Sequence, residues 1–175
     1  MEIKIPTNVV LVGFMGSGKT TTGKELSKLL DYHFFDMDEW IEEKNGMKTW
    51  KIFSEKGEDY FRSQESEAIL GLMAKTGYVI SAGGGVWLKD ANRKILTGLG
   101  MCIWLKVSPQ EAWERISSNL EQRPLLNTSK DPFGQLENIL EKRSPVYSLA
   151  PLSVDTKGKK PKDVALEIFG LLKGL

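Results

Sequence analysis

Thiol and imidazole side chains are nearly absent from this 175-residue chain, which contains one cysteine, Cys102, and one histidine, His33. A single cysteine cannot form a disulfide within the chain, and the two residues cannot supply the ligand cluster of a zinc site. Because Cys102 lies in an apolar run, we expect a buried thiol without a chemical role. A disulfide scaffold and a metal site built from cysteine or histidine are therefore excluded.

The chain also has almost no net charge and no long apolar run. The 24 basic and 23 acidic residues leave a formal net charge of +1, and the one dense basic run, residues 157–160, is typical of a solvated loop. No segment approaches the roughly 18 apolar residues of a membrane span, and residues 1–6 lack the apolar core of a signal peptide. These features predict a cytoplasmic protein without nucleic-acid or membrane partners, and the scattered charge favours a monomer.

One segment, residues 13–20, carries a strong phosphate-binding pattern. Its sequence GFMGSGKT fits G-x-x-x-x-G-K-[ST] and directly follows the apolar run at residues 9–12. Glycines let successive backbone N–H groups converge on phosphate oxygens, and the helix that follows adds its positive N-terminal dipole. Lys19 would contact the β- and γ-phosphates, and the Thr20 hydroxyl would bind Mg²⁺. The pattern predicts that the chain binds a nucleoside triphosphate.

Apolar segments of strand length alternate with amphipathic segments of helix length along the chain. This alternation is typical of βαβ units on a parallel sheet, and the length fits one domain over residues 1–175. We predict an α/β fold with three α/β/α layers and a central five-stranded parallel sheet that carries the P-loop. The expected strands are residues 8–12, 33–35, 78–81, 101–106 and 152–155, and helices are expected to begin at Pro109, Pro132 and Pro161.

The stretch at residues 119–130 differs from its surroundings because it is polar and has no helical period. It contains Arg123 followed by Pro124-Leu125-Leu126. We expect an exposed loop that is long enough to act as a mobile lid and to bring Arg123 onto a bound nucleotide.

In a parallel sheet of this kind, ligands bind beyond the carboxyl ends of the strands. Asp36 and Asp38 follow the second expected strand, and in an extended segment their side chains would project to the same side. One carboxylate could hold Mg²⁺ and the other could accept a proton from an acceptor hydroxyl. The alternative is a solvated turn that caps the next helix, and both interpretations can hold together.

Two further groups allow a structural and a functional interpretation. Arg62 has Glu58 and Glu65 as helical neighbours, which fits either a surface ion pair or a clamp for a substrate carboxylate. The glycines at 83–85 follow the third expected strand and form either a wide turn or a backbone segment that faces a ligand. Phosphoryl transfer also needs positive charge around the moving group, although single arginines are usually solvated. The remaining candidates are Arg115, Arg123 and Arg143.

Taken together, these residues resemble the shikimate kinase family of P-loop folds. The resemblance covers nearly the whole chain and keeps the family's order of motifs. The P-loop alone indicates only a nucleotide, whereas the ordered set is much more specific. The matching segments are 13–20, Asp36-Met37-Asp38, Gly57-Glu58 with Phe61-Arg62 and Glu65, Gly83-Gly84-Gly85, Arg123-Pro124-Leu125-Leu126, and Arg143-Ser144-Pro145-Val146-Tyr147.

The resemblance implies ATP-dependent phosphorylation of the 3-hydroxyl of shikimate, with Mg²⁺ as cofactor, in aromatic amino-acid biosynthesis. It implies an acceptor-binding helical region at about residues 36–68 and a lid at about 119–130. Lys19, Asp38 and Arg123 would be catalytic, with Asp38 as the candidate base, and Thr20 and Asp36 would hold the metal. The implied ATP-binding residues are Gly13, Met15, Gly16, Ser17, Gly18, Lys19, Thr20, Thr21, Arg115, Arg123 and Asp155, and the implied shikimate-binding residues are Asp38, Arg62, Gly83, Gly84, Gly85 and Arg143.

Two departures and two rivals accompany this interpretation. Thr20 stands where many members carry serine, and outside residues 123–126 the lid matches poorly, as does Asp155 with its neighbour Thr156. One rival is another small-molecule kinase, for gluconate or a nucleotide, but two arginines outside the P-loop and lid favour an acceptor with a carboxylate. The second alternative is a regulatory module that binds a nucleotide without turnover. Such a module would be expected to lack some of the acceptor-side residues, and the sequence retains all of them.

Overall fold

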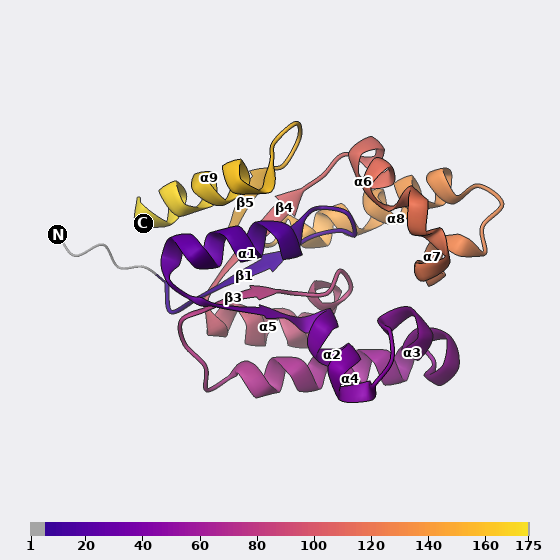
Figure 1. Cartoon of the computed structure of the whole chain (residues 1–175), viewed down its shortest axis with the longest axis horizontal. Coiled ribbons are helices and arrows are strands. Elements are labelled where there is room, and N and C mark those ends of the chain that lie inside the picture. The colour runs from indigo at the N-terminus through magenta and orange to yellow at the C-terminus, as the bar shows by residue number, and fades with distance from the viewer. Residues whose placement is uncertain (1–5, 175) are drawn as a thin grey trace.

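A five-stranded, all-parallel sheet forms the centre of the computed structural model, which describes residues 6–174. Residues 1–5, which make up most of the N-terminal segment considered above, lie outside this range. The strand order is β2-β3-β1-β4-β5, and helices cover both faces of the sheet (Figure 1). This confirms the predicted α/β fold. The strands are β1 (Asn8–Val12), β2 (His33–Asp36), β3 (Tyr78–Ser81), β4 (Met101–Lys106) and β5 (Leu152–Asp155).

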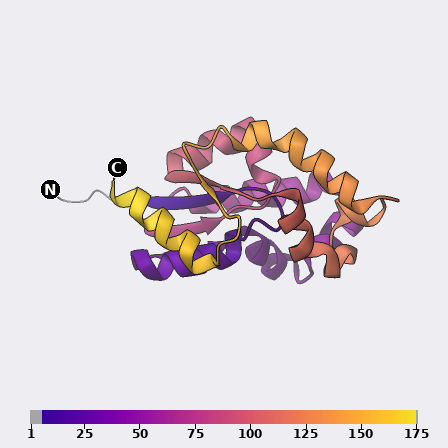
Figure 2. The ribbon, with the colours of Figure 1, turned by 90° about the horizontal axis from the view of Figure 1, so that it is seen from above.

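The central strand β1 shows why the sequence predicted the sheet so closely. All five of its residues are buried, because helices pack on both faces and a parallel central strand then needs apolar side chains in both directions. Val10 and Val12 face the cluster that contains residues of α4 (Glu58–Leu72), α5 (Asp90–Leu99) and α8 (Pro132–Tyr147), whereas Val9 and Leu11 face α1 (Lys19–Leu30) and α9 (Pro161–Lys173). Figure 2 shows α8 and α9 on opposite sides of the sheet. Cys102 is buried beside β1, as expected.

The predicted helix starts are also confirmed. The Ser108 hydroxyl accepts the N–H of Glu111 at 3.3 Å, and the Asp131 carboxylate accepts the N–H of Gly134 at 3.0 Å, each with proline in the first turn. No helix within residues 6–174 is both long and apolar enough to cross a membrane. The helices are α1 (Lys19–Leu30), α2 (Met37–Asn45), α3 (Thr49–Lys56), α4 (Glu58–Leu72), α5 (Asp90–Leu99), α6 (Pro109–Ile116), α7 (Pro124–Asn127), α8 (Pro132–Tyr147) and α9 (Pro161–Lys173), with the short 3₁₀ helices η1 (Val86–Leu88) and η2 (Ser117–Gln122).

The expectation of an irregular, exposed loop at residues 119–130 is wrong in part. Two short helices, η2 and α7, occupy most of this segment, and Leu126 is fully buried in the main core. Each helix is too short to produce a periodic apolar pattern, which explains why no helix was predicted there. Leu126 attaches the segment to the core, and the exposed remainder stays a candidate lid.

Candidate active site

A cavity of about 360 Å³ opens at the carboxyl ends of β1 and β3, which is where ligands bind in sheets of this topology. Its volume falls in the range of small-molecule binding sites. The P-loop, α2, α3, α4, the glycine segment, the candidate lid and α8 all contribute to its wall. The lining residues are Met15, Gly16, Gly18, Lys19, Thr20, Thr21, Asp38, Thr49, Trp50, Phe53, Phe61, Arg62, Glu65, Ser81, Gly84, Gly85, Gln122, Arg123, Pro124, Leu125 and Arg143.

The P-loop connects β1 to α1 and depends on its glycines for two reasons. Gly13, Gly16 and Gly18 have φ angles of 145°, 76° and 84°, which L side chains rarely adopt. At Gly16 a Cβ would also lie 3.0 Å from the carbonyl oxygen of Ala112 in α6. No side chain caps α1, so its first backbone N–H groups are available to an anion.

Lys19 lies at the start of α1 and lines the cavity. Its ammonium group donates hydrogen bonds to the carbonyl oxygens of Gly13 at 3.1 Å and Phe14 at 2.9 Å. Burial lowers the pKa of Lys19 to about 8, although the carboxylates of Asp38 and Asp36 oppose this shift. The side chain is therefore still mainly charged at neutral pH, and a phosphate would stabilise that charge further.

Thr20 and Asp36 meet beside the P-loop as a pair of hard oxygen groups. The Thr20 hydroxyl donates to Oδ2 of Asp36 at 2.6 Å, while Oδ1 accepts the N–H groups of Asp38 and Glu39 as the N-cap of α2. Asp36 thus fulfils the capping interpretation and still presents an oxygen to Thr20. In residues 6–174 no cluster of three or more acidic, histidine or cysteine side chains is placed to hold a metal. Two protein oxygens suit Mg²⁺, which keeps waters and phosphate oxygens as its other ligands.

Asp38 reaches the cavity by a different geometry from the one the sequence suggested. The strand ends at Asp36, so Asp38 lies in the first turn of α2 and not in an extended segment. Water in the open cavity reaches the carboxyl, and protein atoms surround it on the other sides. This partial burial raises the pKa of Asp38 to about 6, and Asp36 adds to the shift while Lys19 and Arg123 oppose it. A carboxyl with this pKa can accept a proton near neutral pH.

Arg62 is held by two glutamates of its own helix. Its guanidinium donates to Glu58 at 3.1 and 3.3 Å and to Glu65 at 2.8 Å. Glu65 is almost fully buried, which raises its pKa to about 7 against the opposing effect of Arg62. These contacts use three of the five N–H donors of Arg62 and leave two for a ligand in the cavity. The ion-pair and clamp interpretations are therefore compatible.

The glycines at 83–85 are required by close approach and not by backbone conformation, since none of the three has a positive φ. A Cβ on Gly85 would lie 2.7 Å from Cζ of Arg62, inside van der Waals contact. A Cβ on Gly83 would lie 3.0 Å from Oε1 of Glu65 and 3.2 Å from Oδ1 of Asp38. The segment thus lets the acceptor-side charges pack against bare backbone.

Two further arginines complete the positive wall. Arg143 lines the cavity from α8, and Arg123 lines it from the segment between η2 and α7. Nε of Arg123 is buried and, within the part of the chain that the structure describes, has no hydrogen-bond partner. A guanidinium that lines a cavity and has a buried, unused donor is suited to an anionic ligand.

Some predicted site residues lie away from the cavity surface. Arg115 donates from α6 to the carbonyl of Gly16 at 2.8 Å, and Asp155 accepts the N–H of Lys157 at 2.9 Å in a turn after β5. Gly13, Ser17, Asp36 and Gly83 lie behind or beside the lining residues, so their predicted contacts with ligands remain predictions.

Two aromatic residues of the cavity wall, Trp50 and Phe53, were not predicted from the sequence. They lie one turn apart on α3. Thr49, at the first position of α3, and Gln122, at the end of η2, are further lining residues that were not predicted. Aromatic side chains at helical spacing usually indicate core packing, so the sequence offered no separate indication. Their place within the predicted acceptor-binding region, residues 36–68, was the one feature of the sequence that pointed to the site.

Comparisons with known proteins agree on one family. A family model described as "Shikimate kinase" matches residues 15–173. Among curated relatives, a shikimate kinase from Thermodesulfovibrio yellowstonii is 42% identical over 93% of this chain and 92% of its own length. A shikimate kinase from Legionella pneumophila is 41% identical over 99% of both chains.

Solved structures extend the comparison to three dimensions. Shikimate kinase from Acinetobacter baumannii, in complex with shikimate, matches with a TM-score of 0.91 at 32% identity over 98% of this chain and 95% of its own. Shikimate kinase from Aquifex aeolicus matches with a TM-score of 0.81 at 34% identity over 95% and 96% of the two chains. A gluconokinase from Sinorhizobium meliloti, at 20% identity over 97% and 93% and a TM-score of 0.67, shares the fold alone.

Proposed function

The chain belongs to the shikimate kinase family, and we propose that its cavity binds ATP and shikimate and transfers the γ-phosphoryl group to the 3-hydroxyl of shikimate. The protein is accordingly an enzyme of aromatic amino-acid biosynthesis. One observation carries the assignment: a P-loop, a carboxyl with a pKa of about 6 and two arginines outside the P-loop and lid line the same cavity. A nucleotide site alone would not require Arg62 and Arg143.

In this proposal the P-loop and the start of α1 bind the phosphates, and Lys19 supplies a positive charge to the transferred group. Thr20 and Asp36 would hold Mg²⁺, which would neutralise part of the phosphate charge. Arg115, which contacts the P-loop, would act near the adenine or the phosphates, and Asp155 would act on the adenine side. Arg123 would add positive charge as the lid, residues 119–130, closes over the nucleotide.

The acceptor would lie against the region at residues 36–68 and the glycine segment. Arg62 and Arg143 would bind its carboxylate, because planar guanidinium groups match carboxylates in two parallel hydrogen bonds. Asp38 would orient the reacting hydroxyl and take its proton. Phosphoryl transfer passes through a loose transition state, so positioning and charge stabilisation supply most of the catalysis. We further propose that the chain acts as a monomer with small-molecule substrates only.

The acceptor can be identified by measuring ADP release from ATP and Mg²⁺ with different substrates. We expect release with shikimate to exceed release without acceptor by orders of magnitude, and gluconate and nucleoside monophosphates to leave the background unchanged. A gluconate or nucleotide kinase would respond to one of those acceptors. Equal ADP release with and without shikimate would contradict the proposal, and nucleotide binding without turnover would indicate a regulatory module.

The close approach at Gly85 gives a test of the carboxylate clamp. Gly85→Ala places a methyl group where the Arg62 guanidinium lies, and this flexible side chain must move away while the fold remains. Losing one clamp interaction should raise the KM for shikimate about tenfold or more, with the KM for ATP changed less than twofold. Gly71→Ala is the matched control, because no atom lies within 4 Å of its added Cβ. Unchanged shikimate KM in Gly85→Ala would remove Arg62 from the clamp.

A further inference from the structure

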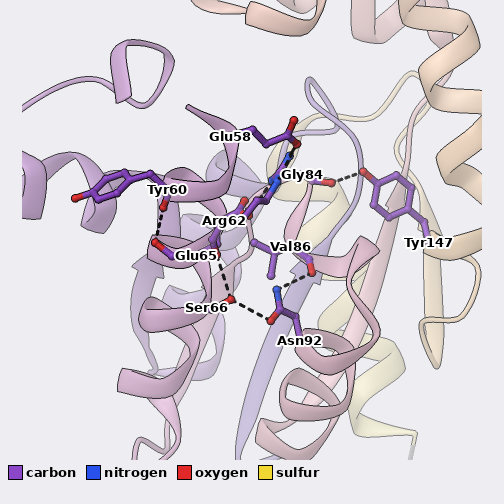
Figure 3. A network of polar contacts seen from close by, with 10 residues as sticks. Glu58, Tyr60, Arg62, Glu65, Ser66, Gly84, Val86, Asn92 and Tyr147 are labelled. Atoms are coloured by element: carbon purple, nitrogen blue, oxygen red, sulfur yellow. Dashed lines mark hydrogen bonds and ion pairs between the residues drawn. The ribbon is translucent and has the colours of Figure 1, made fainter. Parts of the chain in front are cut away.

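The glycine segment 83–85 has no side chains with which to fix its own position, yet its backbone borders the acceptor side of the cavity. Side chains from two helices hold it instead (Figure 3). The Tyr147 hydroxyl donates to the carbonyl oxygen of Gly84 at 2.5 Å. Nδ2 of Asn92 donates to the carbonyl oxygen of Val86 at 3.3 Å, just beyond the last glycine. Neither side chain lines the cavity itself.

Packing and further hydrogen bonds hold both anchors, Tyr147 and Asn92, in place. Tyr147 is fully buried, and its ring stacks on Trp104 of β4 with centroids 6.2 Å apart. The neighbouring carbonyl of Val146 accepts the indole N–H of Trp87 at 2.8 Å, so α8 is bonded both to η1 and to the glycine segment before it. Burial raises the pKa of the Tyr147 phenol, which therefore remains a proton donor. Asn92 is likewise buried and accepts the Ser66 hydroxyl from α4 at 3.5 Å.

The position of Tyr147 in the chain connects this anchor to the clamp. Tyr147 and Arg143 lie four residues apart in α8, which is about one helical turn, so the two side chains lie on the same face. The Tyr147–Gly84 bond therefore sets how far Arg143 is from the glycine segment. The next residue, Gly85, packs against the Arg62 guanidinium, so the same segment also locates the second arginine.

We propose that Tyr147 and Asn92 are positioning residues that fix the glycine segment relative to Arg143 and Arg62 and thereby set the affinity for the acceptor carboxylate. The inference rests on the function proposed above. Binding a carboxylate through two guanidinium groups requires their separation to match it closely. The hydrogen bonds at Gly84 and Val86 limit how far the glycine segment can move relative to those groups. The phenol and the amide touch no substrate. They act through the backbone that they hold.

The proposal is tested with Tyr147→Phe, which keeps the aromatic ring and removes only the hydroxyl. We expect the shikimate KM to rise about three- to tenfold, the effect of one hydrogen bond, with the ATP KM changed less than twofold and kcat changed least. The shikimate Kd, measured by titration calorimetry without ATP, should rise by the same factor. Asn92→Ala tests the other anchor in the same assays and should raise the shikimate KM and Kd in the same way. It keeps the proposal testable if Tyr147→Phe does not fold.

Tyr32→Phe is the matched control, because it also removes a tyrosine hydroxyl bonded to a backbone carbonyl, that of Pro6 at 2.9 Å, at the opposite end of the sheet. We expect it to leave both KM values unchanged. A shikimate KM within twofold of wild type in the folded anchor variants would overturn the inference, as would equal increases in both KM values. Failure of the proposed function gives a different result, since wild type itself would then lack shikimate-dependent ADP release.

Discussion

Replacing Asp38 by asparagine is expected to lower kcat by about 10²- to 10⁴-fold, the usual contribution of a positioned general base. Asparagine keeps the size of the side chain and its hydrogen-bonding capacity, so shikimate should still bind, and its KM should change by less than the loss in kcat. The measurement is steady-state ADP release at saturating shikimate and ATP. Near-normal turnover of Asp38→Asn would remove Asp38 from the role of base.

The pH profile gives the same test a second readout. Because burial raises the pKa of Asp38 to about 6, the wild-type kcat/KM should increase with pH through that value as the carboxyl loses its proton. The asparagine variant should lack this acid limb. Glu43→Gln, an exposed change on the same helix, is the matched control and should keep both the rate and the limb.

The Asp38→Asn substitution should preserve or raise thermal stability while it lowers activity. A carboxyl whose pKa is raised on folding favours the folded state below its unfolded pKa of about 4, and this contribution is lost as pH rises through about 6. At pH 7.5 the charged Asp38 therefore costs stability, and Asp38→Asn should show a thermal midpoint equal to or above wild type. An inactive variant with a higher midpoint cannot owe its inactivity to unfolding.

Replacing Lys19 by methionine is expected to lower kcat/KM for ATP by about 10²- to 10³-fold, the cost of removing one preorganised charge from the transition state. Methionine preserves the length of the apolar stem but cannot bind the transferred phosphoryl group. The Lys19 ammonium donates to the carbonyls of Gly13 and Phe14, which places its charge beside the P-loop backbone. Steady-state kinetics with varied ATP provide the measurement.

The alkaline limb of the wild-type profile belongs to the same residue. Burial lowers the pKa of Lys19 to about 8, so kcat/KM for ATP should fall above that pH as the charge is lost. Bound phosphates raise the pKa again, so kcat itself should decline only at higher pH. Lys24→Met in α1 is the control, because Lys24 is half exposed and pairs with Glu39 on the surface. A loss of rate in Lys24→Met equal to that in Lys19→Met would contradict the assignment.

Features encoded in contiguous residues could be predicted from the sequence. The P-loop is one segment in which strand, glycines, lysine and hydroxyl follow one another, and the structure shows the positive φ angles that this pattern requires. The central strand β1 was predicted because a parallel strand buried on both faces needs a continuous apolar run. The order of motifs predicted the shikimate kinase family, and the comparisons confirm it.

Features that depend on packing between distant segments could not be predicted. Sequence spacing left open whether Arg62 formed a surface ion pair or a clamp, and only the structure shows it paired with Glu65 while packed against Gly85. The extended geometry expected for Asp36 and Asp38 was wrong because Asp36 caps α2 and turns the chain there. The helices within residues 119–130 and the aromatic wall of Trp50 and Phe53 also depend on what packs against them.

The sequence by itself determined the fold, the phosphate-binding loop and the family, because each is written in local patterns or in the order of local motifs. The tertiary structure decided how the acceptor side is assembled, down to the hydrogen bond from Tyr147 to Gly84 across 63 residues of chain. The physical reason is that hydrogen bonds and close approaches act over about 3 Å, a distance that residue spacing fixes within one helix or strand and only packing fixes between them.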